Sequence, residues 1–241
     1  MNIKLAEINT KELIKLEDFL QNNEIDENTF FELTKLINFS FSVEECSRLL
    51  SHHICESIDS YTQQSQRYVK MGPNAFVTPK EIKNLGEEIE KEYCELNKEI
   101  FEFYNKMTKI KEGFAGRKAQ ESDYVYGIKI EDGRYLLPLS TTTNVFMTMN
   151  FSQIIRFYKT MKRIRINESE EILEKLDESI NQALNKKDST VVKKIRELTN
   201  STVEEKEAIA FFDEYFSKIT QENDCIFINS FEQPILSLIH I

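Results

Sequence analysis

Apolar and polar residues alternate along the chain with two different periods, which predict both helices and strands. Between residues 10 and 21, apolar residues recur at the three- and four-residue spacing of one helical face: Leu13, Leu16, Phe19 and Leu20. From Ile37 to Ser42 apolar and polar residues alternate one by one, which is strand periodicity. A short helix is expected at 43–53. The segment 57–68 shows neither period, and we expect a loop there.

The longest helical pattern starts after Pro79 and is expected to end near Gly113. An exposed loop should follow at 113–126, and the β-branched segment 141–150 predicts a second strand. Helical patterns return in the remaining chain, over 151–165, 168–186, 189–199 and 202–220. The short apolar runs 225–228 and 235–241 are expected to be strands.

The pattern as a whole favours one α+β domain. Helical and strand periods are mixed along the chain, with no internal repeat and no Pro/Ser-rich linker. The chain has 241 residues, which is enough for a sizeable core. Six Gly and four Pro suggest long helices joined by short connections.

Charge excludes some classes of partner. Lys and Arg total 31 against 41 Asp and Glu, a formal net charge of −10. A nucleic-acid-binding protein needs a broad basic face, so we expect no nucleic-acid partner. No apolar run reaches the roughly 18 to 20 residues of a membrane span, and we expect no membrane partner. The four cysteines lack the spacing of a zinc site, so we expect no metal and a reducing, cytoplasmic compartment.

Candidate chemistry concentrates in the polar segment 60–68, which reads SYTQQSQRY. It gathers hydroxyls, amides and one guanidinium without an apolar face to bury. Such groups suit recognition of a phosphate or a base edge, with Arg67 as the bidentate partner of an anion. A solvated surface loop is the alternative reading of the same composition.

The same segment closely resembles the central motif of the flavin-dependent thymidylate synthases (the ThyX family), which ends in S-x-R-Y. Residues 131–138 (EDGRYLLP) are similar to the family's E-D-A-R-x-V-L-P, and 148–158 are similar to its T-x-N-x-R-x-L-x-x-F. The resemblance covers roughly 30–172 and is strongest over 36–172. It implies a ThyX-like α+β fold, with a mixed or antiparallel sheet flanked by long helices.

The resemblance also implies a domain division and an assembly. The family-like domain is expected at 1–172, followed by a divergent helical extension at 173–241. Because the chain ends on the apolar run Leu-Ile-His-Ile, we expect the natural protein to continue beyond residue 241. Members of the family form homotetramers with active sites between subunits.

Members of the family methylate dUMP to dTMP. The one-carbon unit comes from methylenetetrahydrofolate, reduced FAD supplies the hydride, and NADPH reduces the flavin. By resemblance, the substrate-binding residues are His53, Gln63, Gln64, Ser65, Gln66, Arg67 and Arg134. Arg134 and Arg163 are the expected catalytic residues, acting as preorganised positive charge near the uracil. Gln63 and Asn150 are the expected FAD contacts.

Departures from the family pattern gather on the flavin side. The family has Arg-His-Arg where a gap-free count places Cys55, Glu56 and Ser57. Glu56 would repel the FAD pyrophosphate. A gap-free count also puts Met161 at the family's catalytic arginine, and Arg163 reaches that place only after a two-residue insertion. The nucleotide side is better preserved.

Three functions therefore remain open at the level of sequence. The chain is a flavin-dependent thymidylate synthase, a divergent paralogue that binds a pyrimidine nucleotide without flavin chemistry, or a structural partner in a mixed oligomer. The segment 55–57 separates the first two readings.

Overall fold

In the computed structural model, the described residues are 1–114, 117–164 and 166–200. The elements follow one another as β1 (Asn2–Ile8), α1 (Thr10–Asn22), α2 (Glu27–Thr34), β2 (Asn38–Ser47), α3 (Arg48–Ser57), β3 (Tyr61–Gln63), α4 (Lys80–Lys83), α5 (Glu87–Met107), η1 (Glu121–Asp123), α6 (Ile130–Gly133), η2 (Arg134–Leu136), β4 (Thr142–Asn150), α7 (Phe151–Arg163), α8 (Asn167–Ala183) and α9 (Thr190–Leu198). The expected helix at 202–220 and the expected strands at 225–228 and 235–241 lie outside the described residues.

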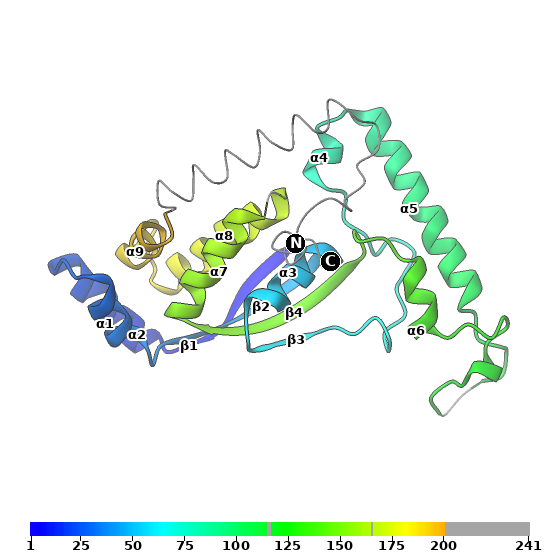
Figure 1. The fold of residues 1–241 in the computed structure, drawn as a ribbon, viewed down its shortest axis with the longest axis horizontal. Helices are drawn as coiled ribbons and strands as arrows, with labels where there is room; N and C mark the ends of the chain where they lie inside the picture. The colour runs from blue at the N-terminus through cyan, green and yellow to red at the C-terminus, as the bar shows by residue number, and fades with distance from the viewer. Residues whose placement is uncertain (115–116, 165, 201–241) are drawn as a thin grey trace, which may run out of the picture. The chain divides into compact units, whose positions relative to one another are not determined.

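Within this part of the chain the strands form one four-stranded antiparallel sheet in the order β1-β2-β4-β3, as Figure 1 shows. The expected α+β class is therefore confirmed, and the sheet is antiparallel. Alternate residues of β2 and β4 pair across the strands and are buried, as Phe41 with Met147 and Val43 with Val145. On the other face Ser40 and Thr148 share a hydrogen bond of 2.9 Å between their hydroxyls.

The main core lies between the buried face of the sheet and the helices α1, α2, α3, α7, α8 and α9, which contribute buried apolar side chains to one cluster. Phe30 and Phe39 both make edge-to-face contacts with Phe151 at the start of α7, with ring centroids 5.2 and 4.9 Å apart. A second, smaller cluster joins α5 to the segments on either side of it through Met71, Phe101, Tyr104 and Leu137.

Several predictions from the sequence pattern were wrong. Strand β1 and helix α2 were not predicted. The helix expected from 43 begins at Arg48, because β2 continues to Ser47 through a bulge at which Glu45 has φ of 56°. The loop expected at 57–68 contains β3. The long helix after Pro79 is divided into α4 and α5 at Gly86, whose φ is 114°, and it ends at Met107.

The residues Met1–Thr199 make one compact unit. The boundary expected at residue 172 falls inside α8. The division between family-like domain and extension therefore stays a prediction about sequence. None of the described helices combines the length and apolarity needed to cross a membrane.

Candidate functional site

The candidate site is built where the chain doubles back after α3. Ser47 caps this helix, because its Oγ accepts a hydrogen bond of 2.9 Å from the Leu50 amide, and so fixes Arg48 in the first turn. After α3 the chain turns and β3 pairs with β4. Gln63 Nε2 then donates to Ser51 Oγ at 2.8 Å, so β3 is tied to the middle of α3.

Between α3 and the segment after β3 lies a cavity of about 420 Å³, which we call the polar pocket. It is lined by Arg48, His52, Cys55, Glu56, Tyr61, Gln63, Gln64, Ser65, Gln66, Arg67 and Arg134. The structure thus brings together every predicted substrate-binding residue of the segment 63–67 and adds Arg134, which lies almost 70 residues further along the chain.

Three arginines from three separate segments line the polar pocket. Arg48 begins α3, Arg67 follows β3, and Arg134 begins η2. The Arg134 guanidinium carbon lies 5.1 Å from the ring centroid of Tyr135. Arg134 Nε and Gln66 Nε2 are buried and have no hydrogen-bond acceptor among the described residues. Buried donors are nearly always satisfied in native proteins, so these two point to a partner of another kind.

The loop that carries Ser65 and Arg67 is fixed to β4 through Asn144. The Gln64 amide donates to the Asn144 carbonyl at 2.9 Å, and Asn144 Nδ2 donates to Gln64 Oε1 at 2.7 Å. Ser65 Oγ accepts a hydrogen bond from the Arg67 amide at 3.2 Å. Gln64 therefore positions the loop, and its side-chain oxygen is already used within the protein.

The residues that sequence reasoning did not assign to the pocket are mainly on α3. Four residues of α3 line the pocket: Arg48, His52, Cys55 and Glu56. A helical wheel of 48–57 would have placed Arg48, His52 and Glu56 on one face, because they are spaced by four residues. His52 Nε2 lies 3.2 Å from Glu56 Oε1, one turn further along. Burial raises the pKa of the Cys55 thiol, and contact with the Tyr61 hydroxyl opposes this in part.

Three predicted site residues lie elsewhere in the described chain. His53 does not line the polar pocket, and its pKa is lowered, first by burial and then by the neighbouring His52. Asn150 caps α7, where its Oδ1 accepts from the Gln153 amide at 3.0 Å. Arg163 is the last residue of the same helix. The roles expected for these three residues stay predictions.

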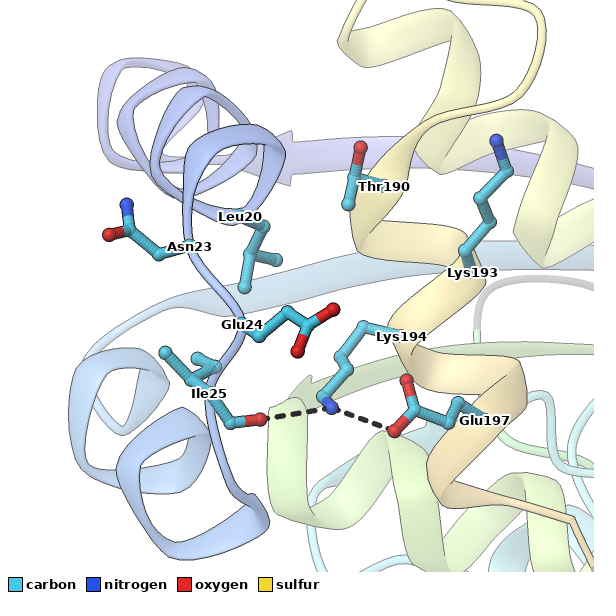
Figure 2. Close-up of a pocket in the computed structure, with 8 residues that line it drawn as sticks. All are labelled: Leu20, Asn23, Glu24, Ile25, Thr190, Lys193, Lys194 and Glu197. Atoms are coloured by element: carbon cyan, nitrogen blue, oxygen red, sulfur yellow. Dashed lines mark hydrogen bonds and ion pairs between the residues drawn. The ribbon is translucent and has the colours of Figure 1, made fainter.

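Another cavity, of about 440 Å³, lies between α9 and the connection from α1 to α2 (Figure 2). Lys194 Nζ donates there to the Ile25 carbonyl at 3.1 Å and to Glu197 Oε1 at 2.8 Å. Glu24 and Lys193 also line this cavity. The charges of this cavity balance and Lys194 is engaged, so it offers a weaker anion site than the polar pocket.

Comparison with known proteins gives consistent matches. The sequence profile of a family described as thymidylate synthase complementing protein matches residues 22–184. The chain is 33% identical over 123 residues to a flavin-dependent thymidylate synthase of Thermococcus onnurineus and 38% identical over 125 residues to one of Pyrococcus horikoshii. These alignments cover 49% and 50% of this chain but 43% and 44% of the relatives, so the chain spans less than half of their length.

Among solved structures, a UMP/dUMP methylase, PolB, from Streptomyces cacaoi bound with 5-Br dUMP has a similar fold. The TM-score is 0.51 at 14% identity, and the match covers 76% of this chain and 90% of that one.

Proposed function

We propose, from the premise that the chain belongs to the thymidylate synthase complementing protein family, that its polar pocket binds a uridine-type monophosphate. The observation that carries this proposal is the convergence of Arg48, Arg67 and Arg134 in one cavity of a protein whose net charge is −10. A guanidinium binds a phosphate through two parallel hydrogen bonds, and a few local arginines suffice for one mononucleotide.

Each predicted contact then has a specific task. Arg67 and Ser65 hold the phosphate, while Gln63 and Gln66 offer amide groups to the sugar or the base. Arg134 places a fixed positive charge near the uracil, where it would stabilise negative charge that develops on the ring. Gln64 positions this loop through Asn144, so we expect its effect on affinity to be indirect.

For the whole protein we propose thymidylate synthesis, the reaction after which its relatives are named. The resemblance implies methylation of dUMP with methylenetetrahydrofolate as the carbon donor and NADPH as the reductant. Arg163 remains the candidate for the second catalytic arginine. The family's homotetramer, with active sites shared between subunits, and a cytoplasmic location belong to the same proposal.

The FAD of the family does not fit the residues that this chain places at 55–57. These residues form the last turn of α3, where the carbonyl ends of the helix already disfavour an anion. Glu56 adds a negative charge, and Ser57 Oγ donates to the His53 carbonyl at 2.6 Å.

This misfit favours a second candidate function, a pyrimidine-nucleotide-binding member of the family without flavin chemistry. The absorbance of the purified protein separates the two functions. A yellow protein that releases flavin on denaturation would support the synthase, and a colourless protein that gains no absorbance with added FAD would support the second candidate.

Nucleotide binding itself is tested by replacing Arg67. Calorimetric titration should show that Arg67→Ala weakens binding of dUMP by about 1.5–3 kcal/mol, the range for a hydrogen bond to a charged group. That corresponds to roughly 10- to 150-fold in Kd. Arg156→Ala is the matched control, because Arg156 pairs with Asp59 at 2.9 Å and does not line the polar pocket. Equal affinities of the two variants would remove Arg67 from the site.

A further inference from the structure

A row of side chains on α3 gives the two ends of the polar pocket opposite charges. Arg48, His52 and Glu56 are spaced by four residues, so they lie on one face of the helix, and all three line the pocket. The first and the last are eight residues apart, which is about 12 Å along a helix axis. A cation therefore stands at one end of the row and a carboxylate at the other.

The opposite wall of the polar pocket is formed by β3 and the segment after it, and this part of the chain runs antiparallel to α3. The Tyr61 hydroxyl contacts Cys55 near the end of α3, and Gln63 reaches Ser51 one turn from its start. The chain then continues to Ser65 and Arg67, which places them toward the Arg48 end. Glu56 remains beside the first residues of β3.

Backbone hydrogen bonds join the start of α3 to the segment that follows η2. The amides of Arg48 and Leu49 donate to the carbonyls of Thr141 and Leu139 at 2.8 and 3.1 Å, in the segment that follows η2. Arg67 is also close to this region, because its charge is among those that lower the pKa of the Glu131 carboxyl, after the larger effects of Lys129 and Lys118. Arg48 thus stands at the end of the α3 row that is opposite to Glu56.

Glu56 is the one carboxylate among the described residues that line the polar pocket. Its side chain is 56% exposed, and His52 lies beside it at 3.2 Å. A carboxylate accepts hydrogen bonds and donates none, so it favours a neutral O–H or N–H group and opposes a phosphate. Glu56 lies about 12 Å along the helix axis from Arg48.

We propose that Glu56 is the specificity-determining residue of the polar pocket and that it accepts a hydrogen bond from the nucleoside part of the bound nucleotide. This inference rests on the proposed function. The donor is the 2′-hydroxyl of a ribose, a group that has a known carboxylate partner in dinucleotide-binding sites.

Calorimetric titrations of UMP, dUMP and dCMP test this role. UMP differs from dUMP by a 2′-hydroxyl, and dCMP carries an amino group in place of a carbonyl oxygen. We expect the wild-type protein to bind UMP at least 5-fold more tightly than dUMP, and Glu56→Ala to abolish that preference. A preference for dCMP that Glu56→Ala abolishes would overturn the ribose hydroxyl as the donor.

The ratio of the affinities for two nucleotides separates the hydrogen bond of Glu56 from its repulsion of the phosphate. Removing the negative charge of Glu56 should strengthen binding of all three phosphates alike, and this effect cancels in the ratio. Glu32→Gln, at an exposed carboxylate of α2 that pairs with Lys35, is the control and should leave the ratios unchanged. Ratios that are the same in the wild type and in Glu56→Ala would overturn the role of Glu56. Absence of binding of any nucleotide to the wild type would instead overturn the proposed function, and this inference with it.

Discussion

Glu17 shows how one buried side chain joins distant parts of this fold. Its carboxylate lies at the start of α9, where it accepts hydrogen bonds of 3.0 and 2.9 Å from the amides of Thr190 and Val191 and one of 2.9 Å from Lys186. Burial alone would raise the pKa of Glu17, but these hydrogen bonds lower it to about 2. Glu17 of α1 thus supplies the negative charge that favours the start of α9.

Neutralising Glu17 should therefore destabilise the protein. We expect Glu17→Gln to lower the free energy of unfolding at pH 7 by about 1.5–3 kcal/mol, the range for hydrogen bonds to a charged group. Since the folded pKa lies below the value of 4.5 for a free carboxyl, the contribution of Glu17 is complete above that pH and is lost as the pH falls toward 2. Urea unfolding at several pH values measures this.

The control is Glu12→Gln on the same helix, where an exposed pair with Lys15 contributes little. If Glu17→Gln and Glu12→Gln changed the unfolding free energy equally at pH 7, the role assigned to Glu17 would be wrong.

At the residue scale the sequence predicted the pocket segment but not its supports. Ser65 and Arg67 stand out because they are polar residues in a segment without an apolar face. Asn144 could not be found in this way, since one asparagine in a strand carries no periodic signal and its partner Gln64 lies 80 residues away. Arg48 was visible as an arginine, but the bulge before it decides which way α3 points.

At the scale of elements, several helices were predicted well and the edges of the sheet were not. The helices at 10–21, 151–165 and 189–199 agree with α1, α7 and α9 within a few residues. Strand β1 was missed because a register shift between Leu5 and Glu7 interrupts its alternation. Strand β3 was missed because its side chains are exposed on both faces and so give no apolar pattern.

The contact of α6 with α5 places the start of η2, and Gly133 is the point of closest approach. A Cβ at residue 133 would lie 2.3 Å from Thr108 Cγ2, at the end of α5, and 3.4 Å from Tyr104. The family motif that residues 131–138 resemble has an alanine where this chain has Gly133. Arg134 follows directly.

Overpacking this contact should displace Arg134. We expect Gly133→Ala to lower the free energy of unfolding by about 1–3 kcal/mol, the usual cost of an inserted methyl group in a packed site, and to weaken binding of dUMP. The double variant Gly133→Ala with Thr108→Ser should recover most of both losses, because serine keeps the hydrogen bond of 2.8 Å to the Tyr104 carbonyl and removes the methyl group. A double variant as impaired as the single one would refute this account of the contact.

At the scale of the whole molecule, charge and fold agree on one site. The acidic chain excludes a broad basic surface, while the polar pocket collects three arginines from the start of α3, the segment after β3 and the start of η2. Sequence reasoning reached two of them through the motifs at 60–70 and 131–138. The third depends on the way α3 and β3 lie against each other, which is a property of the fold.

The most direct measurement is a crystal structure of the protein with bound dUMP. Our account predicts the nucleotide in the polar pocket, with its phosphate oxygens within hydrogen-bond distance of the Arg67 guanidinium and Ser65 Oγ and its nucleoside toward Glu56. A nucleotide bound outside this pocket, or one whose phosphate lies at the Glu56 end, would contradict the account.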